Sequence, residues 1–97
     1  MRIIARKTLK DFWLSHAGAE QPLKAWFAEA SAAKWKSFKD IKKSYRSADV
    51  LSGNRAVFDI KGNRYRLIVK IHYNTGIVLI RFIGTHADYD KIDATTI

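Results

Sequence analysis

Residues 57–73, VFDIKGNRYRLIVKIHY, alternate apolar and polar side chains around a Gly-Asn pair at 62–63. This pair tolerates the positive φ angles of a two-residue hairpin turn. Antiparallel partners count outward from such a turn, which predicts that Lys61 lies opposite Arg64. The alternation therefore predicts a two-stranded ribbon with two different faces.

Period two places most apolar side chains of this hairpin on one face and its charges on the other. The expected apolar face carries Phe58, Ile60, Tyr65, Leu67, Val69 and Ile71. The expected opposite face carries Val57, Asp59, Lys61, Arg64, Arg66, Ile68, Lys70 and His72. Lysine and arginine outnumber acidic residues there by four to one, so an anion is expected to bind this face.

The composition is that of a small basic globular protein. At 97 residues, 47% of them apolar, the chain suits one domain, expected to span 1–97. Its net charge of +9 points to nucleic acid, an acidic protein or an anionic membrane surface as partner. The sequence has no cysteine, no recognisable signal peptide and no apolar run that could cross a bilayer, so a soluble, cytoplasmic protein is expected.

Helices are predicted in the first half of the chain. A short strand is expected over 1–5, and apolar residues then recur at helical spacing behind Thr8, a candidate N-cap. Pro22 opens a second helix, and Ser37 is the candidate cap of a third. The aromatic residues of these segments are expected in the core, namely Trp13, Trp26, Phe27, Trp35 and Phe38.

Strands are predicted in the second half. Residues 44–54 are polar and contain a glycine, which favours a connecting loop. Three strands are expected after it, at roughly 56–61, 64–73 and 77–84. This order predicts an α+β fold in which an N-terminal strand and two to three helices pack on one face of an antiparallel sheet.

Several polar positions admit two interpretations. Asp59 and Arg66 would pair across the strands if the charged face were only a solvated surface, an interaction of small energetic worth. Arg81 joins or leaves this face according to the length of the second loop. His86 and Tyr89 follow the last strand on a polar segment, where they are either substrate contacts or ordinary surface and packing residues.

No motif for a metal or a nucleotide cofactor is present. The three histidines lack ligand spacing such as HExxH, and no cysteine is available as a thiolate ligand. The glycines at 53, 62 and 76 are typical of hairpins and loops and form neither a GxGxxG pattern nor a P-loop. We therefore expect no cofactor.

In the segments FDIKGNRYRLIVKI and FIGTHADYDKI the chain resembles the HigB toxins of type II toxin-antitoxin modules, which belong to the RelE-like ribonuclease superfamily. The opening MRIIARKTLKDFW and the WFAEA segment resemble the same family, so the resemblance spans nearly the whole chain. It implies a RelE-like fold and an mRNA interferase, a small basic protein that cleaves mRNA, usually on the translating ribosome. It also implies a cognate HigA-like antitoxin with a helix-turn-helix, and a toxin-antitoxin complex that binds its own operator DNA.

The resemblance also implies site residues. RelE-like enzymes use an unmetallated cluster of basic residues, often with a late tyrosine or histidine, to drive attack of the ribose 2′-hydroxyl on the adjacent phosphate. By motif, Arg66 matches the family's sheet arginine, Lys61 matches a basic residue on the preceding strand, and Tyr89 matches the late tyrosine. Some relatives carry an arginine near His86, which is therefore expected to bind phosphate or transfer a proton. The expected RNA contacts are Arg64, Lys70 and Lys91.

These observations favour a toxin that is a metal-independent endoribonuclease acting on mRNA, without membrane association. A non-catalytic RNA-binding or ribosome-binding domain would use the same basic face for phosphates and remains the alternative. A basic module that only pairs with an acidic protein is a third possibility, and it predicts indifference to RNA.

Overall fold

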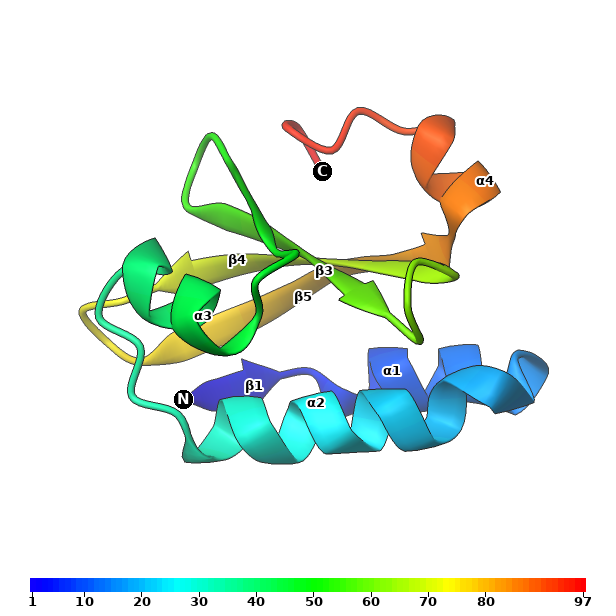
Figure 1. Cartoon of the computed structure of the whole chain (residues 1–97), viewed down its shortest axis with the longest axis horizontal. Coiled ribbons are helices and arrows are strands. Elements are labelled where there is room, and N and C mark those ends of the chain that lie inside the picture. The colour runs from blue at the N-terminus through cyan, green and yellow to red at the C-terminus, as the bar shows by residue number, and fades with distance from the viewer.

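The computed structural model describes residues 1–97 and is built on a five-stranded sheet (Figure 1). The strands are β1 (Arg2–Ile4), β2 (Asp49–Leu51), β3 (Arg55–Ile60), β4 (Tyr65–His72) and β5 (Ile77–Thr85), in the spatial order β1-β5-β4-β3-β2. Consecutive strands from β2 to β5 pair antiparallel, and β3, β4 and β5 are the three strands predicted from the sequence. The sheet is mixed, because β1 pairs with β5 in parallel.

The helical elements are α1 (Arg6–Ser15), the 3-10 turn η1 (Ala17–Ala19), α2 (Glu20–Ala32), α3 (Phe38–Ser44) and α4 (His86–Asp90). Helices α1 to α3 follow one another along the chain, as do strands β2 to β5, which confirms the α+β class. Figure 1 shows α1 and α2 side by side on one side of the sheet, and α4 with the C-terminal segment on the other. No helix is both long and apolar enough to cross a membrane.

The predicted apolar face of the hairpin forms the core. Its six residues, from Phe58 to Ile71, belong to one buried cluster with residues of α1, α2 and α3. The expected aromatic residues join it: the rings of Trp26 and Trp35 both contact the ring of Phe58. Side chains at helical spacing, such as Leu23, Trp26 and Ala30 of α2, supply the opposing layer. Burying this apolar surface is what holds the helices against the sheet.

Three predicted local features differ from the structure. Helix α1 begins at Arg6, so Thr8 is inside the helix and is not its N-cap. The expected loop 44–54 contains β2, a three-residue edge strand that is too short to give an alternation signal. The polar tail holds α4, which starts after Thr85.

The hairpin has the predicted register but a different turn. Asp59 pairs with Arg66, and Ile60 pairs with Tyr65. Positive φ angles occur at Lys61 and Gly62, so the turn begins one residue before the predicted Gly62-Asn63 pair. The regular alternation therefore ends at Ile60, and Lys61 does not follow the face assigned to it.

The second face of the sheet is partly covered by the C-terminal segment. Val57 and Ile68 pair across β3 and β4 on this face and are buried, although they lie outside the main core cluster. The backbone oxygen of Ile97 accepts a hydrogen bond of 2.9 Å from Nε of Arg55, and the segment from α4 to the C-terminus lies above the sheet in Figure 1. Only part of the predicted charged face is therefore open to a ligand.

Candidate functional site

Arg66 is the centre of the candidate site. It lies on β4 and its side chain is only 18% exposed. Its Nε donates a hydrogen bond of 3.2 Å to Nε2 of His86, and its Cζ lies 4.9 Å from the centroid of the Tyr89 ring. The structure thus brings together three of the four predicted catalytic residues, which are separated by up to 23 positions in the sequence (89 − 66).

Two carboxylates also contact the guanidinium of Arg66. Oδ1 of Asp59 lies 3.1 Å from Nε, and Oδ2 of Asp49 lies 3.8 Å from Nη1. The ion pair that sequence analysis kept as the alternative interpretation is therefore present. It is not the solvated pair expected there, because the side chains of Arg66 and Asp59 are both 18% exposed. A pair with little water around it holds the arginine in a defined position.

Nε of Arg66 carries one hydrogen and has two neighbours that could accept it, His86 and Asp59. It points to Nε2 of His86, and Oδ1 of Asp59 is in ionic contact but accepts no hydrogen bond. Because Nε2 of His86 is an acceptor in this arrangement, that nitrogen carries no proton. Its lone pair is occupied by the Arg66 N–H and becomes free to accept another proton when that N–H turns away.

Helix α4 positions His86 and Tyr89. Residues three apart on a helix share a face, and the two rings lie edge to face with centroids 6.4 Å apart. A capping box starts the helix: Thr85 Oγ1 accepts from the N–H of Asp88, and Asp88 Oδ2 accepts from the N–H of Thr85, both at 3.1 Å. These hydrogen bonds from Thr85, followed by the charge of Lys91, hold the pKa of Asp88 below its ordinary value. The backbone N–H of His86 also donates to the carbonyl of Arg64, which ties α4 to the hairpin.

Lys61 does not join the cluster, which corrects its predicted position. Its Nζ lies 2.6 Å from the point where a Cβ on Gly18 would stand, and the hydroxyl of Tyr65 lies 3.6 Å from the same point. The ammonium is therefore on the helix side of the sheet, beside η1. The physical reason is the early turn, which begins with a positive φ angle at Lys61 itself.

The three predicted RNA contacts lie around the cluster and not in it. Arg64 is exposed in the hairpin turn and has no ion-pair partner. Lys70 is on the same face of β4, about 13 Å further along at about 3.3 Å per residue. Lys91 is exposed at the C-cap of α4. Arg81, which sequence analysis left open, is an exposed residue at the irregularity where β5 shifts register against Ile68 and Val69 of β4.

Asp49 is the site residue that sequence analysis missed. It begins β2 and pairs with Val57 of β3, which brings its carboxylate toward Arg66. The segment around it was expected to be a loop, and a three-residue strand carries no periodic signal. The role of Asp88 in capping α4 was also missed, although the spacing Thr85-x-x-Asp88 is a recognisable capping-box pattern.

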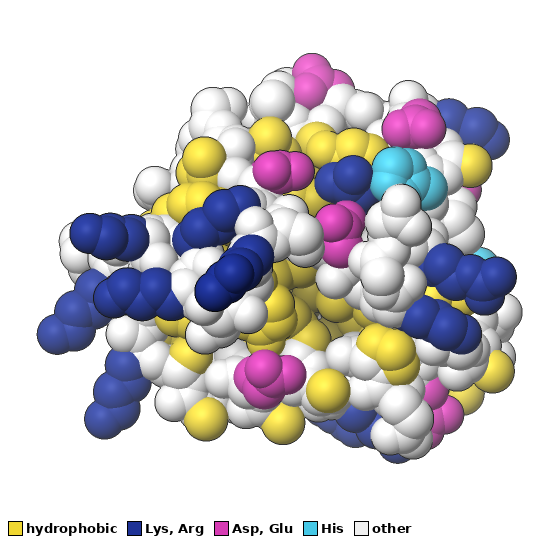
Figure 2. Space-filling model, viewed as in Figure 1, with side chains coloured by type: hydrophobic (Ala, Val, Ile, Leu, Met, Phe, Trp, Pro, Cys, Tyr) yellow, Lys and Arg dark blue, Asp and Glu magenta, His cyan; other side chains and the backbone are white.

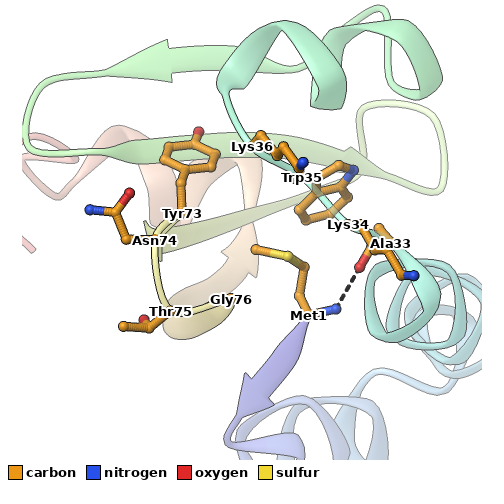
Figure 3. Close-up of a pocket in the computed structure, with 9 residues that line it drawn as sticks. All are labelled: Met1, Ala33, Lys34, Trp35, Lys36, Tyr73, Asn74, Thr75 and Gly76. Atoms are coloured by element: carbon orange, nitrogen blue, oxygen red, sulfur yellow. Dashed lines mark hydrogen bonds between the residues drawn. The ribbon is translucent and has the colours of Figure 1, made fainter.

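The larger hollows of the surface lie away from Arg66. One of about 330 Å³ is formed where the start of β1 meets the end of α2 and the β4–β5 turn (Figure 3). The amino group of Met1 is fixed there by a hydrogen bond of 2.6 Å to the carbonyl of Ala33. No group of three or more His, Cys, Asp or Glu side chains is placed to hold a metal ion.

Comparison with known families identifies the class of protein. A family model described as a RelE-like toxic component of a toxin-antitoxin system matches residues 19–92. The protein is therefore the toxin of such a system, and an antitoxin partner follows from that class. Within this class the matched model is that of the HigB toxins, and the chain belongs to the HigB toxin family. A search of curated proteins finds no significant match.

Proposed function

We propose that this toxin is a metal-independent endoribonuclease that cleaves mRNA on the translating ribosome. The observation that carries the proposal is the contact of Arg66 with His86 and Tyr89 on the face of the sheet opposite α1 and α2. Phosphodiester cleavage without a metal needs a proton acceptor and a cation beside the phosphate, and the imidazole of His86 and the guanidinium of Arg66 can supply them.

The reaction proposed is attack by a ribose 2′-hydroxyl on the adjacent phosphorus. The bond from O2′ to phosphorus forms and the bond from phosphorus to O5′ breaks, which leaves a 2′,3′-cyclic phosphate and a 5′-hydroxyl. Nε2 of His86 accepts the proton of the 2′-hydroxyl, and O5′ takes a proton from a water molecule as it leaves. Arg66 turns its N–H groups to the phosphate oxygens, where negative charge grows in the transition state.

The remaining residues have supporting roles in this proposal. Tyr89 packs on the guanidinium of Arg66 and places a hydroxyl beside the reacting group. Asp59 and Asp49 keep Arg66 in place while no substrate is bound. Arg64 and Lys91 flank the cluster and contact the RNA on either side. Lys61 lies instead beside η1 on the helix side of the sheet, and Lys70 lies about 13 Å further along β4.

The proposed partners include an antitoxin, because the activity of a toxin must be inhibited in the cell that makes it. The family supports an antitoxin, and we propose that it is a HigA-like helix-turn-helix protein whose complex with the toxin binds operator DNA. The site of action is then the cytoplasm, where ribosomes and mRNA are found.

The test is cleavage of a message on translating ribosomes by the purified protein. We expect new RNA ends that persist when EDTA is added under conditions that keep ribosomes intact. Arg66→Ala should remove them, and Arg81→Ala is the matched control, since Arg81 is an exposed arginine of the neighbouring strand with no ion pair. Absence of new ends with the wild-type protein would refute the proposal.

A non-catalytic RNA-binding domain is the second candidate. The observation that favours it is the double carboxylate contact of Arg66, because an arginine held in this way is also common as a purely structural ion pair. Under this alternative, wild type and Arg66→Ala would bind ribosomes alike and neither would cut the message.

A further inference from the structure

The strongest positive charge of the molecule lies outside the Arg66 site. Residues 34–46, KWKSFKDIKKSYR, contain six cations and one acidic residue, so they contribute +5 (6 − 1) to the net charge of +9. The cations, here called the α3 patch, are Lys34, Lys36, Lys39, Lys42, Lys43 and Arg46, and all six are exposed. Figure 2 shows a group of Lys and Arg side chains gathered on the side of the molecule where α3 lies.

The patch has few internal partners. Asp40, its one carboxylate, accepts a hydrogen bond of 2.9 Å from the backbone N–H of Lys36 and has only a loose contact of 3.8 Å with Nζ of Lys43. Lys42 donates to the carbonyl of Ala48. The other four cations have no ion-pair partner within 4.0 Å and are Lys34, Lys36, Lys39 and Arg46. Like charges gathered without partners repel one another, and a bound polyanion removes that cost.

A hollow of about 330 Å³ opens at the edge of the patch. Lys34, Trp35 and Lys36 line one side, and the turn from Tyr73 to Gly76 lines the other (Figure 3). Tyr73 is half-buried and packs against the core, which fixes its ring at the rim. Burial and, to a smaller extent, the charge of Asp40 raise the pKa of Tyr73, so the phenol is neutral at physiological pH. An aromatic ring beside flexible cations is the combination by which proteins hold single-stranded nucleic acid.

We propose that the α3 patch and this hollow form a second RNA-binding surface, separate from the Arg66 site. The lysines contact phosphates of the backbone, and an unpaired base enters the hollow and stacks on Tyr73. An acidic protein would also be drawn to the lysines, but the aromatic-lined hollow favours a nucleobase. The choice of RNA rests on the proposed function, whereas the surface itself does not require that this protein cleaves RNA.

The experiment measures binding of a short 2′-O-methyl RNA, which cannot be cleaved because its 2′-hydroxyl is blocked. Lys36→Gln/Lys39→Gln/Arg46→Gln removes three unpaired cations of the patch. The matched control is Arg2→Gln/Lys10→Gln/Arg81→Gln, which removes three exposed cations without ion pairs from β1, α1 and β5. We expect the patch variant to bind about tenfold more weakly, and the slope of log Kd against log salt to fall by about 2, since each lost contact with a single strand removes ~0.7. The control variant should keep most of the affinity and most of the salt dependence.

A second variant tests the hollow. Tyr73→Leu keeps apolar packing at the rim but removes the stacking surface. We expect it to weaken binding of single-stranded 2′-O-methyl RNA about tenfold, and to leave binding of duplex RNA unchanged, because paired bases cannot enter the hollow.

The possible outcomes separate this surface from the proposed function. Equal weakening by the patch and control variants would show an effect of net charge alone and would overturn the surface. Unchanged RNA binding together with loss of binding to an acidic antitoxin would assign the patch to a protein partner and would also overturn it. A wild-type protein that binds through the patch but never cleaves would refute the proposed function and leave this surface standing.

Discussion

Two regions of this toxin carry arginine or lysine in opposite ways. Around Arg66 the cation is 18% exposed, contacted by two carboxylates and hydrogen-bonded to a histidine. On the α3 patch six cations are exposed and share a single carboxylate. The first arrangement fixes one group in space, and the second offers mobile charge over a wide surface. Under the proposed function, the exposed charge of the α3 patch supplies affinity for RNA, and the fixed contacts of Arg66 supply the chemistry.

The two arrangements differ in how much side-chain entropy is lost when RNA binds. Lysine side chains in the patch lose rotamer freedom on binding, which limits the gain from each contact. Arg66 has lost that freedom already, because Asp59, His86 and Tyr89 restrain it before a substrate is present. Arg66 then has only to turn its N–H groups toward the phosphate, a smaller rearrangement than an unrestrained side chain requires, as expected of a catalytic arginine.

Arg66→Ala is the substitution with the largest expected effect. Removal of the positive charge from the transition state should lower the cleavage rate about 100-fold or more, and affinity for 2′-O-methyl RNA should change little. The measurement is single-turnover cleavage on ribosomes beside equilibrium binding. The variant also leaves Asp59 without its partner, which should lower the free energy of unfolding by about 1–3 kcal/mol. Thermal unfolding checks that the protein is folded, and a variant that is folded and fully active would contradict the role of Arg66.

His86→Ala should have the next largest effect. Loss of the proton acceptor is expected to slow cleavage about 100-fold. Single-turnover cleavage is measured beside binding of 2′-O-methyl RNA and thermal unfolding, which separates a catalytic loss from a loss of structure. A folded variant that cleaves as fast as wild type would rule out His86 as the proton acceptor.

Tyr89 offers a pair of substitutions with a smaller effect. Tyr89→Phe retains the ring over Arg66 and removes only the hydroxyl, whereas Tyr89→Leu removes the cation–π contact as well, worth about 0.5–1 kcal/mol when exposed. If Tyr89 mainly positions Arg66, cleavage by Tyr89→Phe should stay near wild type and cleavage by Tyr89→Leu should fall. Equal loss in both variants would instead assign the function to the hydroxyl.

Asp49→Asn should make Arg66 more like the unpaired cations of the α3 patch, because it removes one of the two carboxylate contacts of Arg66. Asp49 is 64% exposed and lies 3.8 Å from Arg66, so the pair contributes little, about 0–1 kcal/mol, to stability. Removing its negative charge should tighten RNA binding slightly, and the unfolding temperature should stay nearly constant. Asp11→Asn, which neutralises an exposed carboxylate of α1, is the control for net charge. Tighter binding by both variants to the same degree would show that position does not matter.

Acid should loosen the Arg66 site before it affects the α3 patch, although this effect is the smallest. The pKa of Asp88 is lowered in the folded protein, chiefly by hydrogen bonds from Thr85, so its capping contribution is complete above the ordinary carboxyl value of 3.8 and is lost as pH falls through the lower folded pKa. NMR signals of the Tyr89 ring should move in that range. In Asp88→Asn, which keeps an acceptor but does not titrate, the movement should be absent.

The parts of this site that depend on strand periodicity were predictable from the sequence. The opposition of Asp59 and Arg66 follows from counting outward from the hairpin loop, and the buried face from Phe58 to Ile71 follows from period two. The likeness to HigB toxins directed attention to His86 and Tyr89. Helix α4 places both residues beside Arg66, and the Thr85-x-x-Asp88 pattern of its capping box is present in the sequence.

The parts that depend on tertiary contacts were not predictable. Lys61 adopts a positive φ angle that is uncommon for a lysine, and no pattern of residue types indicated that the turn would begin there. Asp49 reaches Arg66 only because a three-residue strand pairs with β3. Pairing to a neighbouring strand fixes such a short element, so its own composition carries almost no information.

The most direct measurement compares two variants in two assays. Cleavage of a ribosome-bound message and binding of 2′-O-methyl RNA are measured for Arg66→Ala and for Lys36→Gln/Lys39→Gln/Arg46→Gln. The division between chemistry and affinity predicts that the first variant binds normally but does not cut, and that the second binds weakly but still cuts when its concentration is raised to saturation. Parallel loss of cutting and binding in both variants would contradict it.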